Sequence, residues 1–128
     1  MNYHPDALEL LRAVNHTLTH EILPNAKAGQ LYPLRMIANA LGIATRELES
    51  RDLNAASETH GLNLLYGKTH DPEGLHIRNR QFAQDIRHGL FEGSARQETD
   101  LRQHLLAVAR AKLAVAYPKG LTPSPRKL

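Results

Sequence analysis

The stretch between Gly93 and Pro118 constrains the fold most, because its apolar residues recur with the period of an α-helix. Seven of them share or flank one face: Leu101, Leu105, Leu106, Val108, Ala109, Leu113 and Ala116. Ser94 belongs to the residue types that cap helix starts, and Gln97 stands at the capping-box position three residues later. We therefore expect a helix over about residues 94–116 that is central to the core.

The same period predicts three earlier helices. The first covers about Pro5–Leu23 and the third about Leu75–Leu90. The second runs from Pro33 through Leu48, and it either breaks near Ser50–Asp52 or continues toward His60. Gly61 is expected to interrupt the second helix, and residues 25–31 and 67–74 are expected to be loops. No β-hairpin signal is present. The sequence thus predicts an all-α fold, a compact bundle of four or five helices.

The charge distribution separates a balanced body from a basic end. Of the 16 Lys and Arg residues, three fall in residues 119–128, which carry no acid, and the remaining 13 match 13 Asp and Glu. We expect one domain over residues 1–118 and a disordered, Pro-containing tail over 119–128. A nucleic-acid-binding domain should be basic in its folded body, so nucleic acid is an unlikely partner and binding through the tail is the weaker alternative.

Several functional classes lack their defining residues. The 128-residue chain has no cysteine, which excludes disulfides, thiolate metal sites and a cysteine nucleophile. No apolar run approaches the roughly 20 residues of a membrane span, and the first residues do not resemble a secretory signal. Glycine-rich phosphate loops and dinucleotide motifs are also missing. We expect a cytoplasmic protein without a membrane partner or cofactor, and an enzymatic role stays open but is not favoured.

Three segments of the chain carry a shared pattern. The first runs from Pro5-Asp6 to Leu23-Pro24, the second from Arg35-Met36-Ile37 to Arg46-Glu47-Leu48, and the third is Ala111-Lys112-Leu113-Ala114-Val115-Ala116-Tyr117-Pro118-Lys119. Together they resemble a bacterial family of small all-helical domains of unknown function. Members are often encoded beside aminoglycoside-phosphotransferase-like kinases and acyl-CoA dehydrogenases. The resemblance implies a setting in phosphoryl-transfer or acyl-CoA metabolism, and it carries over no catalytic residue.

Arg35, Asn39 and Arg46 form a polar stripe, with Gly42 between them, on the opposite side of their helix from Leu34. Two guanidinium groups beside an amide suit a phosphate or the acidic groups of a protein partner. The same residues could equally pair with acids on neighbouring helices, because the body of the chain is charge-balanced.

Lys112 falls in the middle of the apolar face of the last predicted helix, so it is a candidate buried polar residue. A lysine there must extend its head to solvent, pair with an acid or line a polar pocket. His16 and His20, four residues apart on the first helix, are a weak candidate metal pair that still needs a third ligand.

Three functional hypotheses follow. The leading one is a non-catalytic accessory protein that binds a kinase-like enzyme or an acyl-CoA dehydrogenase through the Arg35/Arg46 face or a residual apolar groove. The alternative is a small enzyme or ligand-binding domain with a site between helices near Lys112. A homodimer is also plausible, because small bundles often bury a spare apolar stripe against a second copy.

Overall fold

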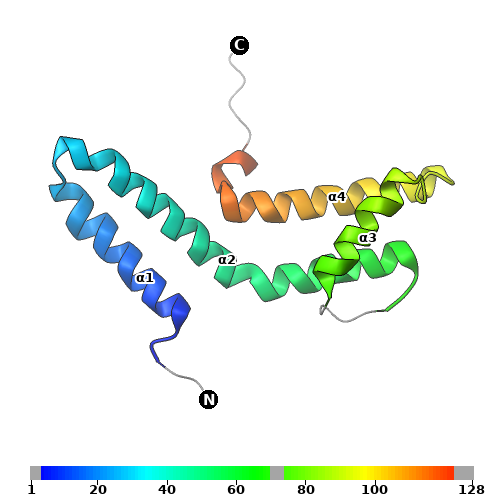
Figure 1. Ribbon diagram of the computed structural model, residues 1–128, viewed down its shortest axis with the longest axis horizontal. Coiled ribbons are helices and arrows are strands. Elements are labelled where there is room, and N and C mark those ends of the chain that lie inside the picture. The colour runs from blue at the N-terminus through cyan, green and yellow to red at the C-terminus, as the bar shows by residue number, and fades with distance from the viewer. Residues whose placement is uncertain (1–3, 70–73, 123–128) are drawn as a thin grey trace, which may run out of the picture. The chain divides into compact units, whose positions relative to one another are not determined.

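The computed structural model describes residues 4–69 and 74–122, and these residues are almost entirely helical (Figure 1). These two ranges contain four α-helices: α1 (Ala7–Thr17), α2 (Ala28–Tyr66), α3 (Leu75–Arg87) and α4 (Ala95–Ala116). No strand occurs in these two ranges. The predicted all-α bundle is confirmed. None of the helices in the described ranges has the length and apolar character needed to cross a membrane.

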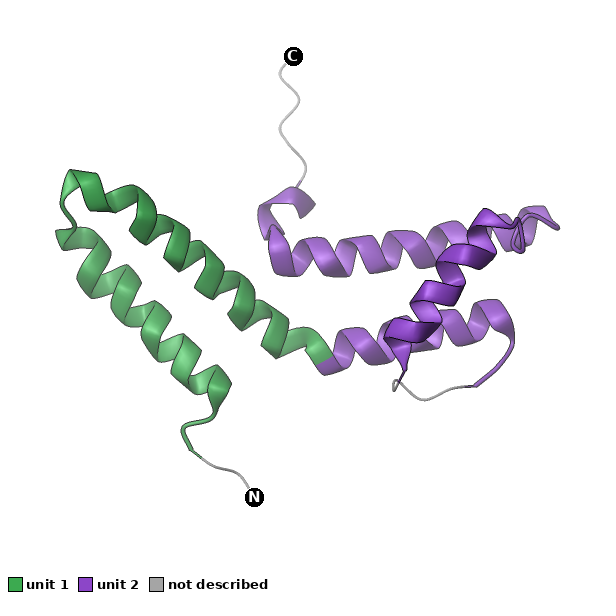
Figure 2. Ribbon diagram, viewed as in Figure 1, with its two compact units in different colours: residues 1–51 green, residues 52–128 purple. Residues whose placement is uncertain are grey.

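The chain divides into two compact units, residues 1–51 and 52–128, and the boundary falls inside α2 (Figure 2). The prediction of one domain over residues 1–118 stays a prediction. The first residues of the predicted tail form a 3-10 helix, η3 (Pro118–Leu121), and residues 123–128 lie outside the described part of the chain.

The first unit pairs α1 with the beginning of α2. Asp6 caps α1 by accepting a hydrogen bond from the Glu9 backbone N–H at 2.9 Å. A salt bridge of 2.8 Å joins Arg12 on α1 to Glu49 on α2. Leu18 is buried in this unit. On α1, Val14 is exposed, whereas the next residue, Asn15, is half-buried.

Pro24, which has no backbone N–H to donate, accounts for the change of helix type after α1. The α-helix gives way to a π-helical turn, η1 (Leu18–Ile22), in which the Leu23 N–H bonds to the Leu18 carbonyl. A 3-10 turn, η2 (Leu23–Asn25), then carries Pro24 in its first positions, where its missing N–H is tolerated. The side chain of Asn25 donates to the Glu21 carbonyl at 2.9 Å and closes the turn.

The second helix is longer than predicted at both ends. It begins at Ala28, five residues before Pro33, so this proline lies inside the helix and leaves the Gly29 carbonyl without its usual N–H donor. It is continuous through Ser50–Asp52 and through Gly61, so the expected interruption at Gly61 is wrong. The Ser50 hydroxyl donates to the Arg46 carbonyl at 2.8 Å, which satisfies its polar group inside the helix.

The core of the second unit is built around Leu62, Phe82 and Phe91. The rings of Phe82 and Phe91 meet edge to face with centroids 5.6 Å apart, and Tyr66 meets Phe91 in the same way at 5.5 Å. After α3, Gly89 has a φ of 76° and the Leu90 N–H returns to the Asp85 carbonyl at 3.0 Å. This left-handed turn ends the helix and brings Phe91 back into the core.

Candidate functional site

The predicted Arg35, Asn39 and Arg46 stripe lies on α2 in the first unit. Arg35 and Asn39 are exposed, whereas Arg46 is half-buried. The Arg46 guanidinium lies over Gly42, since a Cβ built there would be 3.1 Å from Nη1. Arg35 and Arg46 are eleven residues apart, which is roughly 16 Å along a helix at 1.5 Å per residue. The two guanidinium groups are therefore too far apart to bind the same phosphate. The stripe is better suited to an extended acidic surface on a partner.

Two large side chains that the sequence reading missed lie beside Arg35. Tyr32 is 72 % exposed and Met36 is 56 % exposed. Both face away from the half-buried side of this part of α2, whose residues recur at intervals of three and four: Leu31, Leu34, Ala38, Leu41, Thr45 and Leu48. Tyr, Met and Arg are residue types enriched at protein interfaces. Their spacing of three and four residues was the signal available in the sequence.

The two candidate metal ligands do come together. The rings of His16 and His20 have centroids 4.4 Å apart, and both side chains are exposed. Over residues 4–69 and 74–122, no group of three or more His, Cys, Asp or Glu side chains could hold a metal ion. The pair therefore offers two nitrogen ligands at most, fewer than a structural zinc site uses.

The structure corrects the prediction for Lys112, which is exposed and not buried. The side of α4 that is turned inward has a repeat of three and four residues: Leu101, His104, Val108, Ala111 and Val115. His104 takes the buried place that the sequence reading gave to Leu105. The buried face is thus rotated away from Lys112, whose ammonium group stays in solvent.

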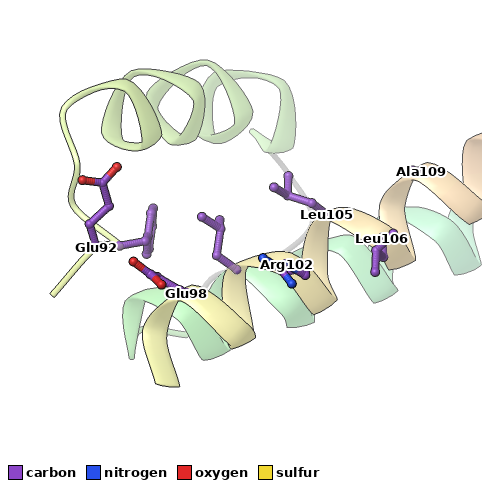
Figure 3. Close-up of a pocket in the computed structure, with 8 residues that line it drawn as sticks. Glu92, Glu98, Arg102, Leu105, Leu106 and Ala109 are labelled. Carbon is purple, nitrogen blue, oxygen red and sulfur yellow. The ribbon is translucent and has the colours of Figure 1, made fainter. Parts of the chain in front are cut away.

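A pocket of about 570 Å³ lies beside α4, where this helix meets the turn that follows α3, and Phe91 and Leu101 form its inner wall (Figure 3). Leu105 and Leu106, 43 % and 47 % exposed, lie in its wall together with Ala109. Glu98 and Arg102 follow on the same helix toward its N-terminus, and Glu92 lines the pocket from the turn beyond α3 (Figure 3). The lining is mainly apolar with charged groups at one end, which suits noncovalent recognition of another molecule.

The contact between His104 and Gly61 fixes where α4 meets α2. A Cβ at Gly61 would overlap the imidazole of His104. The ring also meets Phe82 edge to face at 5.5 Å. Burial lowers the pKa of His104, and the negative charge of Glu58 opposes that shift only in part. The neutral imidazole is therefore the form that the fold favours.

Three buried polar atoms of the second unit have no hydrogen-bond partner within the described ranges: Thr59 Oγ1, Arg78 Nη1 and His104 Nε2. Each such atom costs about 1–3 kcal/mol when it is not satisfied. In contrast to these atoms, the carboxylate of Glu58, next to Thr59 on α2, has a partner, because it accepts a hydrogen bond from Asn79 Nδ2 on α3 at 2.8 Å.

A second polar contact joins α2 to α3. The Tyr66 hydroxyl donates to Asp85 Oδ2 at 2.5 Å, and Gln81 donates to the other carboxylate oxygen at 2.9 Å. The hydrogen bond from Tyr66 is the main reason that the pKa of Asp85 is lowered, followed by that from Gln81. Burial, followed by the bond to Asp85, raises the pKa of Tyr66. Both shifts stabilise a phenol–carboxylate pair at neutral pH.

Comparison with protein families gives a match that covers most of the chain. No curated protein and no solved structure matches the chain. Residues 24–120 match the family described as "Domain of unknown function (DUF6285)". The match includes the Arg35–Leu48 and Ala111–Lys119 segments and also spans the middle of the chain, whereas the Pro5–Leu23 part of the first segment lies before it. Because the matched region covers well over half of its 128 residues, the chain belongs to this family of domains of unknown function.

Proposed function

We propose that this protein is a non-catalytic accessory protein that binds another protein through the α2 face formed by Tyr32, Arg35, Met36 and Asn39. The carrying observation is the exposure of Tyr32, 72 %, beside an exposed Met36 and Arg35 on one helix face. Tyr and Arg are among the residue types that supply most of the binding energy of protein interfaces.

The side chains of this face indicate what kind of surface a partner presents to it. Tyr32 and Met36 offer apolar contact area, while Arg35 can form a bidentate ion pair with a carboxylate. The matching surface therefore has an apolar patch with Asp or Glu at its edge. The family resemblance suggests which proteins carry it: a phosphotransferase-like kinase or an acyl-CoA dehydrogenase in the same cell.

The experiment is an affinity pull-down of the tagged full chain from extract of its own organism, with bound proteins quantified by mass spectrometry. We expect one such enzyme near a 1:1 ratio. The double variant Tyr32→Ala/Arg35→Glu should reduce its recovery at least about tenfold, the effect of losing a central interface residue.

The matched control is Arg110→Glu, the same charge reversal at an exposed position on α4. It should leave recovery unchanged. Equal loss in the control and the double variant would show a general charge effect and contradict the proposed face. Recovery of the tagged chain without any enzyme of the two classes would contradict the partner assignment.

The pocket beside α4 favours a second candidate function, the binding of a small apolar ligand. Its volume, about 570 Å³, is within the range of small-molecule sites. This revises the hypothesis of a site near Lys112, since the pocket lies on α4 but nearer its first half. Titration with a fluorescent fatty acid tests it, and a Leu106→Asp variant should then lose the binding.

A further inference from the structure

The exposed face of α4 is as regular as its buried face. Its positions also recur at intervals of four and three residues: Glu98, Arg102, Leu105, Ala109 and Lys112, all exposed. This is the spacing with which two helices pack along their length. Leu106 flanks the stripe and contributes a second large apolar side chain to the pocket.

The charges along this stripe have a definite order. Glu98 stands near its N-terminal end and Lys112 at its C-terminal end, each seven residues from Leu105. Glu92, Glu98 and Arg102 line that end of the pocket, which therefore carries one excess negative charge. A surface that is negative at one end, apolar in the middle and positive at the other end is complementary to its own reversed copy.

We propose that a second copy of this chain covers the pocket, with the two α4 helices antiparallel and Leu105 at the two-fold axis. Glu98 of each copy then lies opposite Lys112 of the other. In a parallel arrangement each glutamate would face a glutamate and each lysine a lysine, which is unfavourable. This self-association goes beyond the proposed function, because it uses α4 of the second unit and none of the residues of the Tyr32 and Arg35 face.

The first test is the mass of the full-length protein in solution, measured by sedimentation velocity over a micromolar concentration series. We expect a dimer that dissociates on dilution. A strictly monomeric wild-type protein would overturn the proposal. If that monomer bound a fluorescent fatty acid at the pocket, a small ligand would be the occupant instead.

The second test places a charge at the axis. Leu105→Asp sets two carboxylates against each other in the dimer, and we expect the dissociation constant to rise at least about 100-fold. The control is Leu64→Asp, the same substitution at a site on α2 that is 71 % exposed. It should dimerise as the wild type does. Circular dichroism confirms that both variants are folded, and a dimer that tolerates Leu105→Asp would refute the axis.

The third test distinguishes the antiparallel register from any other contact. Glu98→Lys alone and Lys112→Glu alone each create two like-charge pairs, so each should weaken its own homodimer by about tenfold. Mixing the two variants restores an opposite-charge pair at both ends of a mixed dimer. We therefore expect the mixture to dimerise as tightly as wild type, and a mixture as weak as its components would exclude the register.

Discussion

The imidazole of His104 on α4 lies against the backbone of Gly61 on α2, in the space that a side chain at position 61 would fill. This contact explains why a glycine is found in the middle of a continuous 39-residue helix. The missing side chain allows a close approach between the two helices. It also places His104 among the buried residues, with 8 % of its surface exposed.

Replacing Gly61 with alanine should therefore destabilise the protein although alanine is the better helix former. The overlap with His104 should cost roughly 1–3 kcal/mol, beyond the gain of about 1 kcal/mol in helix propensity. Urea unfolding followed by circular dichroism measures the free energy of unfolding.

Gly29 provides the matched control for that substitution. It lies in the first turn of α2, and a Cβ built there has no neighbour within 4 Å. Gly29→Ala should therefore raise the free energy of unfolding, by up to about 1 kcal/mol. If Gly61→Ala were as stable as Gly29→Ala, the close contact with His104 would be refuted.

The lowered pKa of His104 predicts a stability that depends on pH. As the pH falls, the unfolded chain takes up a proton at the ordinary histidine pKa of about 6.5, before the folded protein does. The unfolded state then binds more protons than the folded state, so the free energy of unfolding decreases as pH falls from about 6.5 through the lower folded pKa. Urea unfolding at a series of pH values between 7.5 and 4.5 follows this loss.

The variant His104→Gln isolates the contribution of this residue from that of the other histidines. Its free energy of unfolding should decline less steeply below pH 6.5 than that of the wild type. His60→Gln, at an exposed site on α2, should keep the wild-type slope. Identical slopes in all three proteins would show that burial of His104 does not set the pH dependence.

The helices could be predicted from the sequence, but their contacts could not. The period of the leucines indicated four helices because local spacing determines which residues share a face. The role of Gly61 depends on His104, 43 residues later, and no local pattern connects the two. The apolar pattern placed Leu105 in the core, but its exposure and the burial of His104 are set by how α4 packs in the second unit.

The candidate surfaces were predicted only in part, for a similar reason. Arg35 and Asn39 were found because polar residues at helical spacing stand out from an apolar stripe. Tyr32 and Met36 were missed because apolar side chains on a helix are ordinarily assigned to its buried side. Their exposure follows from the way in which α1 covers one side of α2 and leaves the other open, as Figure 1 shows for the first unit.

The stability of the second unit depends on a small apolar core. Substitutions at two nearby positions of α2, one buried and one exposed, test this. Leu62 is fully buried against Phe82 and Phe91, whereas Leu64 is 71 % exposed. Leu62→Ala should lower the free energy of unfolding by about 2–5 kcal/mol, while Leu64→Ala should change it by less than about 0.5 kcal/mol. Similar losses in the two variants, measured by urea unfolding, would contradict this core.

The phenol of Tyr66 should control the titration of Asp85. Because hydrogen bonds from Tyr66 and Gln81 lower the pKa of Asp85 in the folded protein, this carboxylate adds stability above its unfolded pKa of about 3.9. That stability is lost as pH falls through the lower folded value.

Removing the hydroxyl with Tyr66→Phe keeps the ring among Phe82 and Phe91, and should move the pKa of Asp85 back toward about 3.9. Carbon-detected NMR of the Asp85 carboxyl group follows this shift directly. In Gln81→Ala, which removes the weaker donor, the pKa should rise less than in Tyr66→Phe, and the reverse order would show that Gln81 is the main cause of the lowered pKa.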